Sequence, residues 1–213
     1  MSDDSELLLE HVERRSDEAF RTLVERHSSM VHGVAMRIVR DKLLAEEITQ
    51  AVFIILARKG AGLRRGTVLA GWLHRTARFV ALEALRGEHR RRQKLNHFAQ
   101  MNDSPQTFSV WDQIAPLLEE AMSHLGARDR DVVVLRYLEE KSFAEVASAI
   151  GASEGAVKMR AGRALEKLLW RCPSDTQPDG NLCACPWAEC AMKRKFGATG
   201  GRISAPFPAR LFR

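Results

Sequence analysis

Lys141–Leu169 carries the sequence KSFAEVASAIGASEGAVKMRAGRALEKLL, which predicts two short helices joined by a tight turn. Ser142 and Glu145 fit a capping box, in which each side chain satisfies a free backbone N–H at a helix start. Gly151 is expected to end the first helix, because glycine enters the left-handed conformation without steric cost. Ser153 fits the N-cap of the second helix.

The second of these helices has an apolar back and a basic front. Its apolar residues recur at helical spacing and are Val157, Ala161, Ala164, Leu165 and Leu168. The opposite face and its flank carry Gly155, Lys158, Met159, Arg160, Gly162, Arg163 and Lys167. This pattern is typical of a helix-turn-helix whose second helix enters the DNA major groove. The alternative is an ordinary helical hairpin with a solvated basic face.

Composition indicates an all-α protein that does not enter the membrane. The chain has 213 residues, a single Tyr and little β-branched alternation. Its longest apolar run, Ala51–Ala57, is far shorter than the roughly 20 residues that span a bilayer. The N-terminus is acidic and has no signal-peptide pattern. We therefore expect a cytoplasmic protein without a membrane partner.

Positive charge is concentrated in one internal block. The net charge is +6, and residues 64–94 hold nine Lys or Arg against two Asp or Glu. A localised basic block is the footprint of a polyanionic partner. Residues 1–63 are slightly acidic and would suit a basic partner surface.

Two helices are expected before the basic block. Ser16 should begin the first, in which apolar residues recur at helical spacing as far as Ile38. We interpret His27 and His32 as polar residues at the edge of its packed face. Asp41 should cap the second helix, which runs to Lys59 and has an acidic first half. Its second half, Val52–Ala57, is apolar nearly all round, and we expect it to lie in the core.

The basic block itself predicts a helix with two different faces. Leu73, Ala77, Val80, Ala81 and Ala84 form its core side. The other side interleaves aromatic residues with arginines at Trp72, Arg75, Phe79, Leu82 and Arg86. Single-stranded nucleic acid favours this chemistry, because rings stack on unpaired bases and guanidinium groups hold phosphates. Packing of Trp72, Phe79 and Leu82 on another helix is the alternative.

The domain organisation follows from a break in the helical pattern. Residues 96–113 lack a helical stripe and predict a flexible linker. Helical spacing resumes at residue 114 and continues to residue 170. We therefore expect two small helical domains, residues 1–95 and 114–170, with the helix-turn-helix in the second.

The last segment, residues 171–213, holds all four cysteines: Cys172, Cys183, Cys185 and Cys190. Thiolates suit zinc, and exposed thiols near basic residues suit redox sensing. The spacing is not that of a usual zinc knuckle, and the segment has no His. We expect a disordered tail and list these cysteines only as weak metal candidates.

Four stretches in this order resemble one family, the extracytoplasmic-function (ECF) sigma factors of the sigma-70 family of bacterial RNA polymerase. They are SDEAFRTLVERH (16–27), DKLLAEEITQAVF (41–53), GWLHRTARFVALEALR (71–86) and the segment 128–168. The resemblance implies that residues 1–95 are sigma domain 2, which binds the polymerase clamp and melts the −10 promoter element. It implies that residues 114–170 are sigma domain 4, which reads the −35 element.

The resemblance also implies roles for individual residues. The polymerase-binding residues are Asp41, Glu46, Glu47, Gln50 and Phe53. The −10 residues are Trp72, Arg75, Arg78, Phe79 and Arg86. The −35 residues are Ser153, Gly155, Lys158, Met159, Arg160 and Arg163. An anti-sigma partner is a further family expectation, which no residue of the sequence identifies.

Catalysis is not expected. The glycine-rich loop Lys59–Thr67 lacks the G-K-[ST] ending of a phosphate loop, and no nucleophile–base pair stands out. The sequence therefore predicts a sigma factor without a cofactor. The alternative is a helix-turn-helix transcription regulator that does not act as a polymerase subunit, although a duplex-only regulator has no use for the Trp72–Arg86 face.

Overall fold

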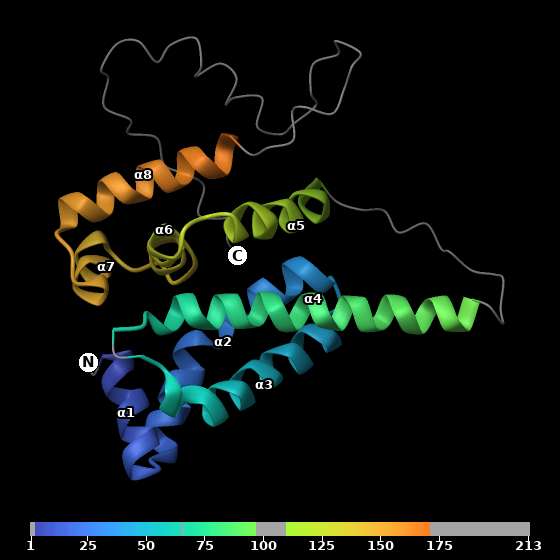
Figure 1. The fold of residues 1–213 in the computed structure, drawn as a ribbon, viewed down its shortest axis with the longest axis horizontal. Helices are drawn as coiled ribbons and strands as arrows, with labels where there is room; N and C mark the ends of the chain where they lie inside the picture. Colours follow the sequence, from blue (N-terminus) through green and yellow to red (C-terminus); the bar gives the residue numbers. More distant parts are fainter. Residues whose placement is uncertain (1–2, 65, 97–109, 171–213) are drawn as a thin grey trace, which may run out of the picture.

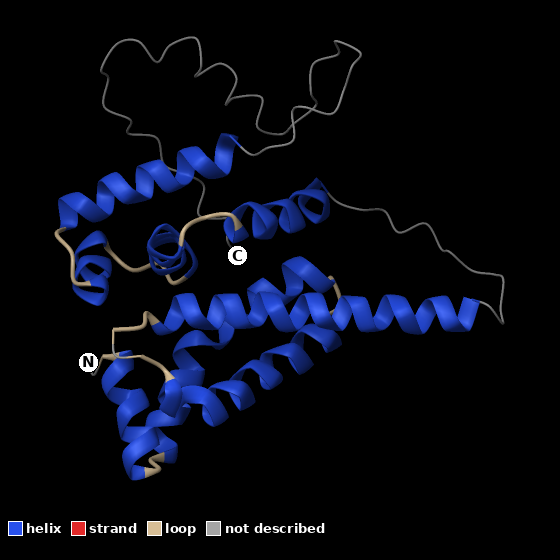
Figure 2. Cartoon of the chain, viewed as in Figure 1, coloured by secondary structure: helices blue, strands red, loops and turns tan. Residues whose placement is uncertain are grey.

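The computed structural model describes residues 3–64, 66–96 and 110–170, and every regular element within them is helical (Figures 1 and 2). The first half of the molecule, residues 3–96, comprises α1 (Asp4–Arg14), α2 (Asp17–Val39), α3 (Lys42–Lys59), the 3-10 turn η1 (Gly60–Gly62) and α4 (Leu69–Asn96). The second half, residues 110–170, comprises α5 (Val110–Ser123), α6 (Ala127–Val133), the π-helical turn η2 (Val134–Leu138), α7 (Phe143–Ile150) and α8 (Glu154–Trp170).

Helix α2 is the centre of the first half and packs against α1, α3 and α4. Ser16 caps it, because its hydroxyl oxygen accepts a hydrogen bond from Ala19 N at 3.2 Å. The predicted apolar face is fully buried at Leu23, Val31 and Val34. The sequence-based assignment of this helix and its start is confirmed.

Helix α1 was not among the expected elements. Only Leu7 of this helix is buried, so the segment has too little apolar periodicity to stand out. The available signal was the spacing Asp3-x-x-Glu6, because Glu6 Oε2 accepts a hydrogen bond from Asp3 N at 3.1 Å. Tertiary contacts with α2 and η1 hold the helix in place.

The helix-turn-helix forms as the sequence predicts. Glu145 N donates to Ser142 Oγ at 3.2 Å, and Ser142 N donates to Glu145 Oε2 at 2.7 Å. Gly151 has φ +65°, the left-handed conformation that ends α7. Ser153 Oγ then accepts a hydrogen bond from Ala156 N at 3.3 Å and caps α8.

The predicted linker is shorter than residues 96–113. Helix α4 continues to Asn96, and α5 already begins at Val110, four residues before the expected restart. Helix α5 depends on tertiary contacts with α2 and α8, and Arg130 fastens its C-terminal end by donating to the carbonyl oxygens of Met122 and Ser123, each at 3.0 Å. The rest of the predicted linker lies outside the described residues.

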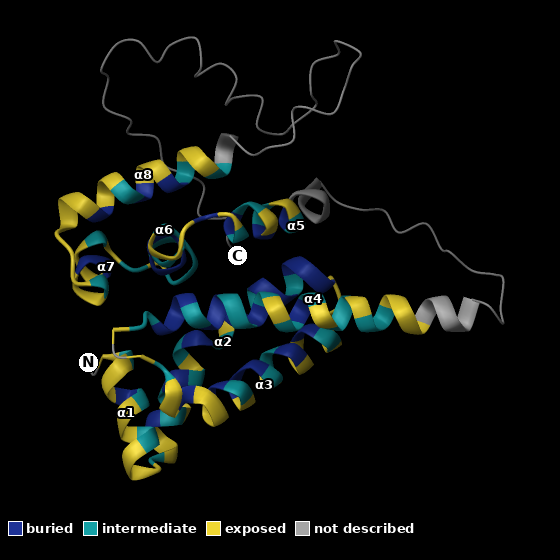
Figure 3. Ribbon diagram, in the orientation of Figure 1, coloured by how far each residue is buried: buried dark blue, intermediate teal, exposed yellow. Residues whose placement is uncertain are grey.

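The two halves pack directly against each other. Contacts join α2 to α5 and α4 to both α6 and η2, and one cluster of buried apolar residues extends from Leu7 to Ala164 through both halves. Figure 3 shows the buried residues on the facing sides of the helices and the exposed ones along the outer sides of α1 and α8. The sequence did not predict this association of the halves.

Candidate nucleic-acid interface

The α8 face, defined as Gly155, Lys158, Met159, Arg160 and Arg163, points away from the core. Four of these residues are exposed and Arg160 is half-buried. Behind them Val157, Ala161 and Ala164 are buried. The predicted −35 residues therefore share one surface of one helix, and Ser153 stands at its N-cap. The structure matches the expected apolar back and basic front.

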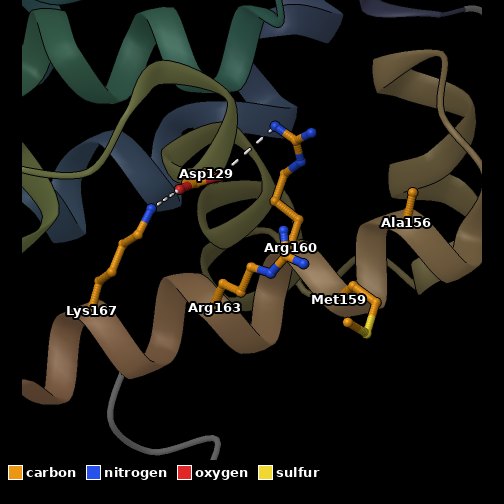
Figure 4. A pocket seen from close by; sticks show the side chains of 6 residues that line it. All are labelled: Asp129, Ala156, Met159, Arg160, Arg163 and Lys167. Atoms are coloured by element: carbon orange, nitrogen blue, oxygen red, sulfur yellow. Dashed lines mark hydrogen bonds and ion pairs between the residues drawn. The ribbon is translucent and has the colours of Figure 1, made fainter.

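Asp129 pairs with two cationic side chains of α8, Lys167 and Arg160 (Figure 4). Its Oδ2 lies 2.6 Å from Lys167 Nζ, and its Oδ1 lies 3.8 Å from Arg160 Nη1. With Ala156, Met159 and Arg163, these residues line a shallow hollow of about 450 Å³. Among the described residues Arg163 has no ion pair, so its guanidinium group is available to a polyanion. The sequence did not predict that Arg160 would be ion-paired while Arg163 is not.

The α4 face, defined as Trp72, Arg75, Arg78, Phe79 and Arg86, is divided by the fold. Phe79 is 63% exposed, and Arg86 is also exposed. Trp72 is half-buried and packs against the core. The alternative that these aromatic rings pack within the protein thus holds for Trp72, whereas the Phe79 ring remains exposed to solvent.

Arg78 contacts the second half, and the positive charge of Arg75 acts on titratable groups there. Arg78 Nε donates to the carbonyl oxygen of Glu119 at 3.2 Å. Burial raises the pKa of Asp131 on α6, and the positive charge of Arg75 opposes that rise. Gly71, near the start of α4, packs so tightly on Asp131 that a Cβ at Gly71 would overlap the carboxylate. Of the proposed −10 arginines, Arg78 is therefore engaged within the chain, whereas Arg86 is exposed.

The α3 face, defined as Asp41, Leu43, Glu46, Glu47, Gln50 and Ile54, lies on the exposed side of α3. Leu43 is 72% exposed and Ile54 is 53% exposed, which is unusual for large apolar side chains. The prediction that all of Val52–Ala57 lies in the core is therefore wrong for Ile54. Leu43 and Ile54 add exposed apolar area to the acidic side of α3.

Phe53 does not belong to this face, which corrects the sequence-based assignment. Its side chain is 6% exposed and forms part of the apolar core. The helical register of α3 places Phe53 beside buried Val52 and Leu56. Phe53 therefore supports the helix from the core side, and a partner bound to the α3 face would not reach it.

His27 joins the two halves through a buried ion cluster. The prediction that it lies at the edge of a packed face is wrong. The ring is fully buried. Nδ1 lies 2.6 Å from Glu139 Oε1, and Nε2 lies 3.2 Å from Asp4 Oδ2. Burial alone would lower the pKa of His27, but contacts with these two carboxylates outweigh it and raise the pKa to about 9. Lys141 Nζ completes the cluster at 3.6 Å from both carboxylates.

A second buried cluster centres on Glu119 of α5. Its Oε1 accepts a hydrogen bond from Arg37 Nε at 2.7 Å, and its Oε2 lies 3.2 Å from His74 Nε2. Burial alone would raise the pKa of Glu119, but the charges of His74 and Arg37 and the hydrogen bonds from them lower it to about 2. The partners come from α2, α4 and α5, so sequence spacing offered no signal for the cluster.

Neither a metal centre nor a membrane span is found in the part of the chain that the structure describes. No group of three or more His, Cys, Asp or Glu side chains there is arranged to hold a metal ion. No described helix is long and apolar enough to cross a bilayer. Cys172, Cys183, Cys185 and Cys190 lie outside the described residues.

Comparison with known proteins decides the family. Residues 23–91 match the model "Sigma-70 region 2", and residues 116–168 match "Sigma-70, region 4". The chain is 34% identical to the RNA polymerase sigma factor CarQ of Myxococcus xanthus over 72% of this chain and 88% of that protein. The chain belongs to the ECF sigma factors. It is therefore a sigma factor of RNA polymerase, a non-enzymatic factor of transcription initiation.

Other ECF sigma factors are similar over comparable lengths. SigM of Mycobacterium tuberculosis is 30% identical over 78% of this chain and 82% of that protein. The solved structure "CnrH in complex with the cytosolic domain of CnrY" aligns at 20% identity with a TM-score of 0.41, covering 82% of this chain and 100% of that one. Family membership favours the sigma factor over the regulator that does not join polymerase.

Proposed function

We propose that this sigma factor brings core RNA polymerase to promoters through three separate surfaces. The α3 face binds polymerase, the α4 face binds the melted −10 strand, and the α8 face binds the −35 duplex. Residues 1–95 then form domain 2 and residues 114–170, extended back to Val110, form domain 4, while residues 171–213 form a tail. Because core polymerase and promoter DNA are in the cytoplasm, the proposed factor acts there. An anti-sigma partner stays a prediction to which no residue is assigned.

The exposed basic side of α8 is the observation that carries this proposal. A helix that follows a capped helix and a left-handed glycine turn presents its first turns to the major groove. Arg163 is exposed and lacks an ion pair within the described residues. An arginine that reaches a guanine edge contributes about 1–3 kcal/mol of discrimination. Such a small contact surface binds weakly alone, and attachment to polymerase raises its effective concentration.

The α4 face supports the −10 role through Phe79 and Arg86. An exposed ring suits stacking on an unpaired base, which is worth about 1–3 kcal/mol. The neighbouring guanidinium group suits the phosphate next to that base. Together they favour single-stranded over duplex DNA.

Promoter-directed run-off transcription tests the proposal. Core polymerase, this protein and a promoter library should yield transcripts that begin at defined sites, whereas core polymerase alone should not. If the protein adds no promoter-specific initiation, the proposed function is wrong.

Two variants test the division of labour. Arg163→Ala should weaken binding to −35 duplex roughly 5- to 150-fold, as expected for losing about 1–3 kcal/mol. Phe79→Ala should reduce promoter melting, followed by permanganate reactivity of the −10 thymines, and should leave duplex binding unchanged. Equal losses in both assays would contradict separate roles.

A further inference from the structure

We propose that Asp129 is a positioning residue for α8, which holds Arg160 and Lys167 away from DNA phosphates and so suppresses sequence-independent DNA binding. The inference rests on the proposed function and names a residue outside the three surfaces assigned to it. Asp129 belongs to α6, whereas both cations that it binds belong to α8. Its carboxylate therefore decides how many cations of α8 a DNA backbone can reach.

The cations of α8 differ in whether a carboxylate of the chain pairs with them. Lys158 pairs with a glutamate one turn earlier in the same helix. Asp129 pairs with two others, through Oδ2 at 2.6 Å from Lys167 Nζ and Oδ1 at 3.8 Å from Arg160 Nη1. Of these four cations, Arg163 is the one without an ion pair among the described residues.

One carboxylate serves both cations because of their positions on α8. Arg160 and Lys167 are seven residues apart, which is two helical turns or about 10 Å along the axis. Figure 4 shows the two side chains reaching Asp129 from positions on either side of Arg163 along the helix. The pairing directs Arg160 and Lys167 toward α6 and leaves the Arg163 guanidinium group for DNA.

The Asp129 carboxylate is sheltered enough to hold these cations. Its side chain is 18% exposed, whereas that of Lys167 is 59% exposed. Pairs between two exposed charges are weak because water screens both partners, and here one partner is largely covered. A phosphate that approaches Lys167 through the hollow also meets the negative charge of Asp129, which lines it. Asp129 thus neutralises the cations and repels the polyanion.

The charge of the second half agrees with this role. Residues 110–170 hold ten Asp or Glu and eight Lys or Arg, so the half that carries the helix-turn-helix is net negative. Sequence-independent binding depends on cations that neutralise phosphates. A half whose cations are outnumbered by carboxylates is expected to bind random DNA poorly. It then docks where Arg163 meets a suitable base edge, once polymerase holds it near the promoter.

A purely structural role for Asp129 is the alternative, in which its ion pairs only fasten α6 to α8. The two roles differ in one measurable respect. If the pairs act only as fasteners, breaking them from either side should have the same effect on DNA binding. If Asp129 shields the cations, its neutralisation should strengthen DNA binding, whereas removal of Arg160 and Lys167 should not.

The salt dependence of duplex binding tests the proposal. The full-length protein is titrated against a fluorescent duplex of random sequence between about 50 and about 200 mM KCl, a range over which phosphate contacts strongly change affinity. The slope of log K against log salt is about −0.9 for each phosphate neutralised. Asp129→Asn frees two cations, so its slope should be steeper than that of the unmodified protein by about 0.9 to 1.8. Its affinity at the lowest salt concentration should be several-fold higher.

Two matched comparisons separate shielding from other effects. Glu120→Gln removes one negative charge from an exposed position of α5, which pairs with neither cation, and its slope should equal that of the unmodified protein. In the Arg160→Gln/Lys167→Gln background, Asp129→Asn should no longer steepen the slope, because no shielded cation remains.

Equal slopes for the unmodified protein and Asp129→Asn, or no duplex binding by either, would overturn the proposal. A slope for Glu120→Gln as steep as that of Asp129→Asn would also overturn it, since net charge would then be the cause. The same holds for an undiminished effect of Asp129→Asn in the double-variant background. Failure of the proposed function gives a different result, because run-off transcription is then absent for the unmodified protein whatever the slopes are.

Discussion

Alkaline pH should destabilise this protein through His27. The histidine has an ordinary pKa of 6.5, and in the folded protein its pKa is raised to about 9. Folding therefore favours the protonated ring, so the stabilisation is complete below about pH 6.5 and is lost as pH rises through about 9. At 1.36 kcal/mol per pKa unit, the shift corresponds to roughly 3 kcal/mol of unfolding free energy.

Urea unfolding followed by far-UV circular dichroism measures this effect. Between about pH 6 and about pH 9.5, the unfolding free energy of the unmodified protein should fall by roughly 3 kcal/mol more than that of His27→Gln. His124→Gln, at an exposed position of the second half, should keep the pH dependence of the unmodified protein. Equal pH dependence of the parent and His27→Gln would refute the reasoning.

The source of the shift can be tested in the same series. Glu139 belongs to the second half and lies 2.6 Å from His27 Nδ1. Glu139→Gln should lower the pKa of His27, measured by proton NMR of the ring. An unchanged pKa would mean that the halves do not meet at this cluster in solution.

Three further changes have defined outcomes. Glu119→Gln leaves the buried Arg37 guanidinium without its counter-charge, so urea unfolding should show a loss of about 3–5 kcal/mol; a loss below about 1 kcal/mol would contradict the pairing. Gly151→Ala should cost about 1–2 kcal/mol because φ is +65° with no side chain nearby, whereas Gly155→Ala within α8 should not destabilise. Ile54→Ser should weaken core polymerase binding by about 1.5–3 kcal/mol, measured by fluorescence titration. The free energy of unfolding should change by less than about 0.5 kcal/mol. Unchanged binding would show that Ile54 is not part of the polymerase-binding surface.

Local structure was predictable wherever neighbouring residues determine it. Ser16, Asp41 and Ser142 each start a helix with their own side chains as acceptors, and such caps depend on three or four consecutive residues. Gly151 ends α7 for a similarly local reason. Helix α1 escaped prediction because it buries a single apolar residue.

The candidate site was predictable in part. The α8 face follows from helical periodicity, because one helix carries both its apolar back and its basic front. The apolar stretch Val52–Ala57 was predicted to be core throughout, which is right for Phe53 and wrong for Ile54, because both sides of α3 carry apolar residues there. His27 was misjudged because its partners, Asp4 and Glu139, are 23 and 112 positions away.

The sequence by itself determined the helices, their caps, the basic face of α8 and the resemblance that placed the chain among sigma factors. Only the tertiary structure decided that Arg78 contacts the second half and that His27 and Glu119 become buried ion-pair centres. The physical reason is range: caps and amphipathic faces arise from residues within a few positions of one another. Burial, ion pairing and coverage of one half by the other depend on groups that only folding brings together.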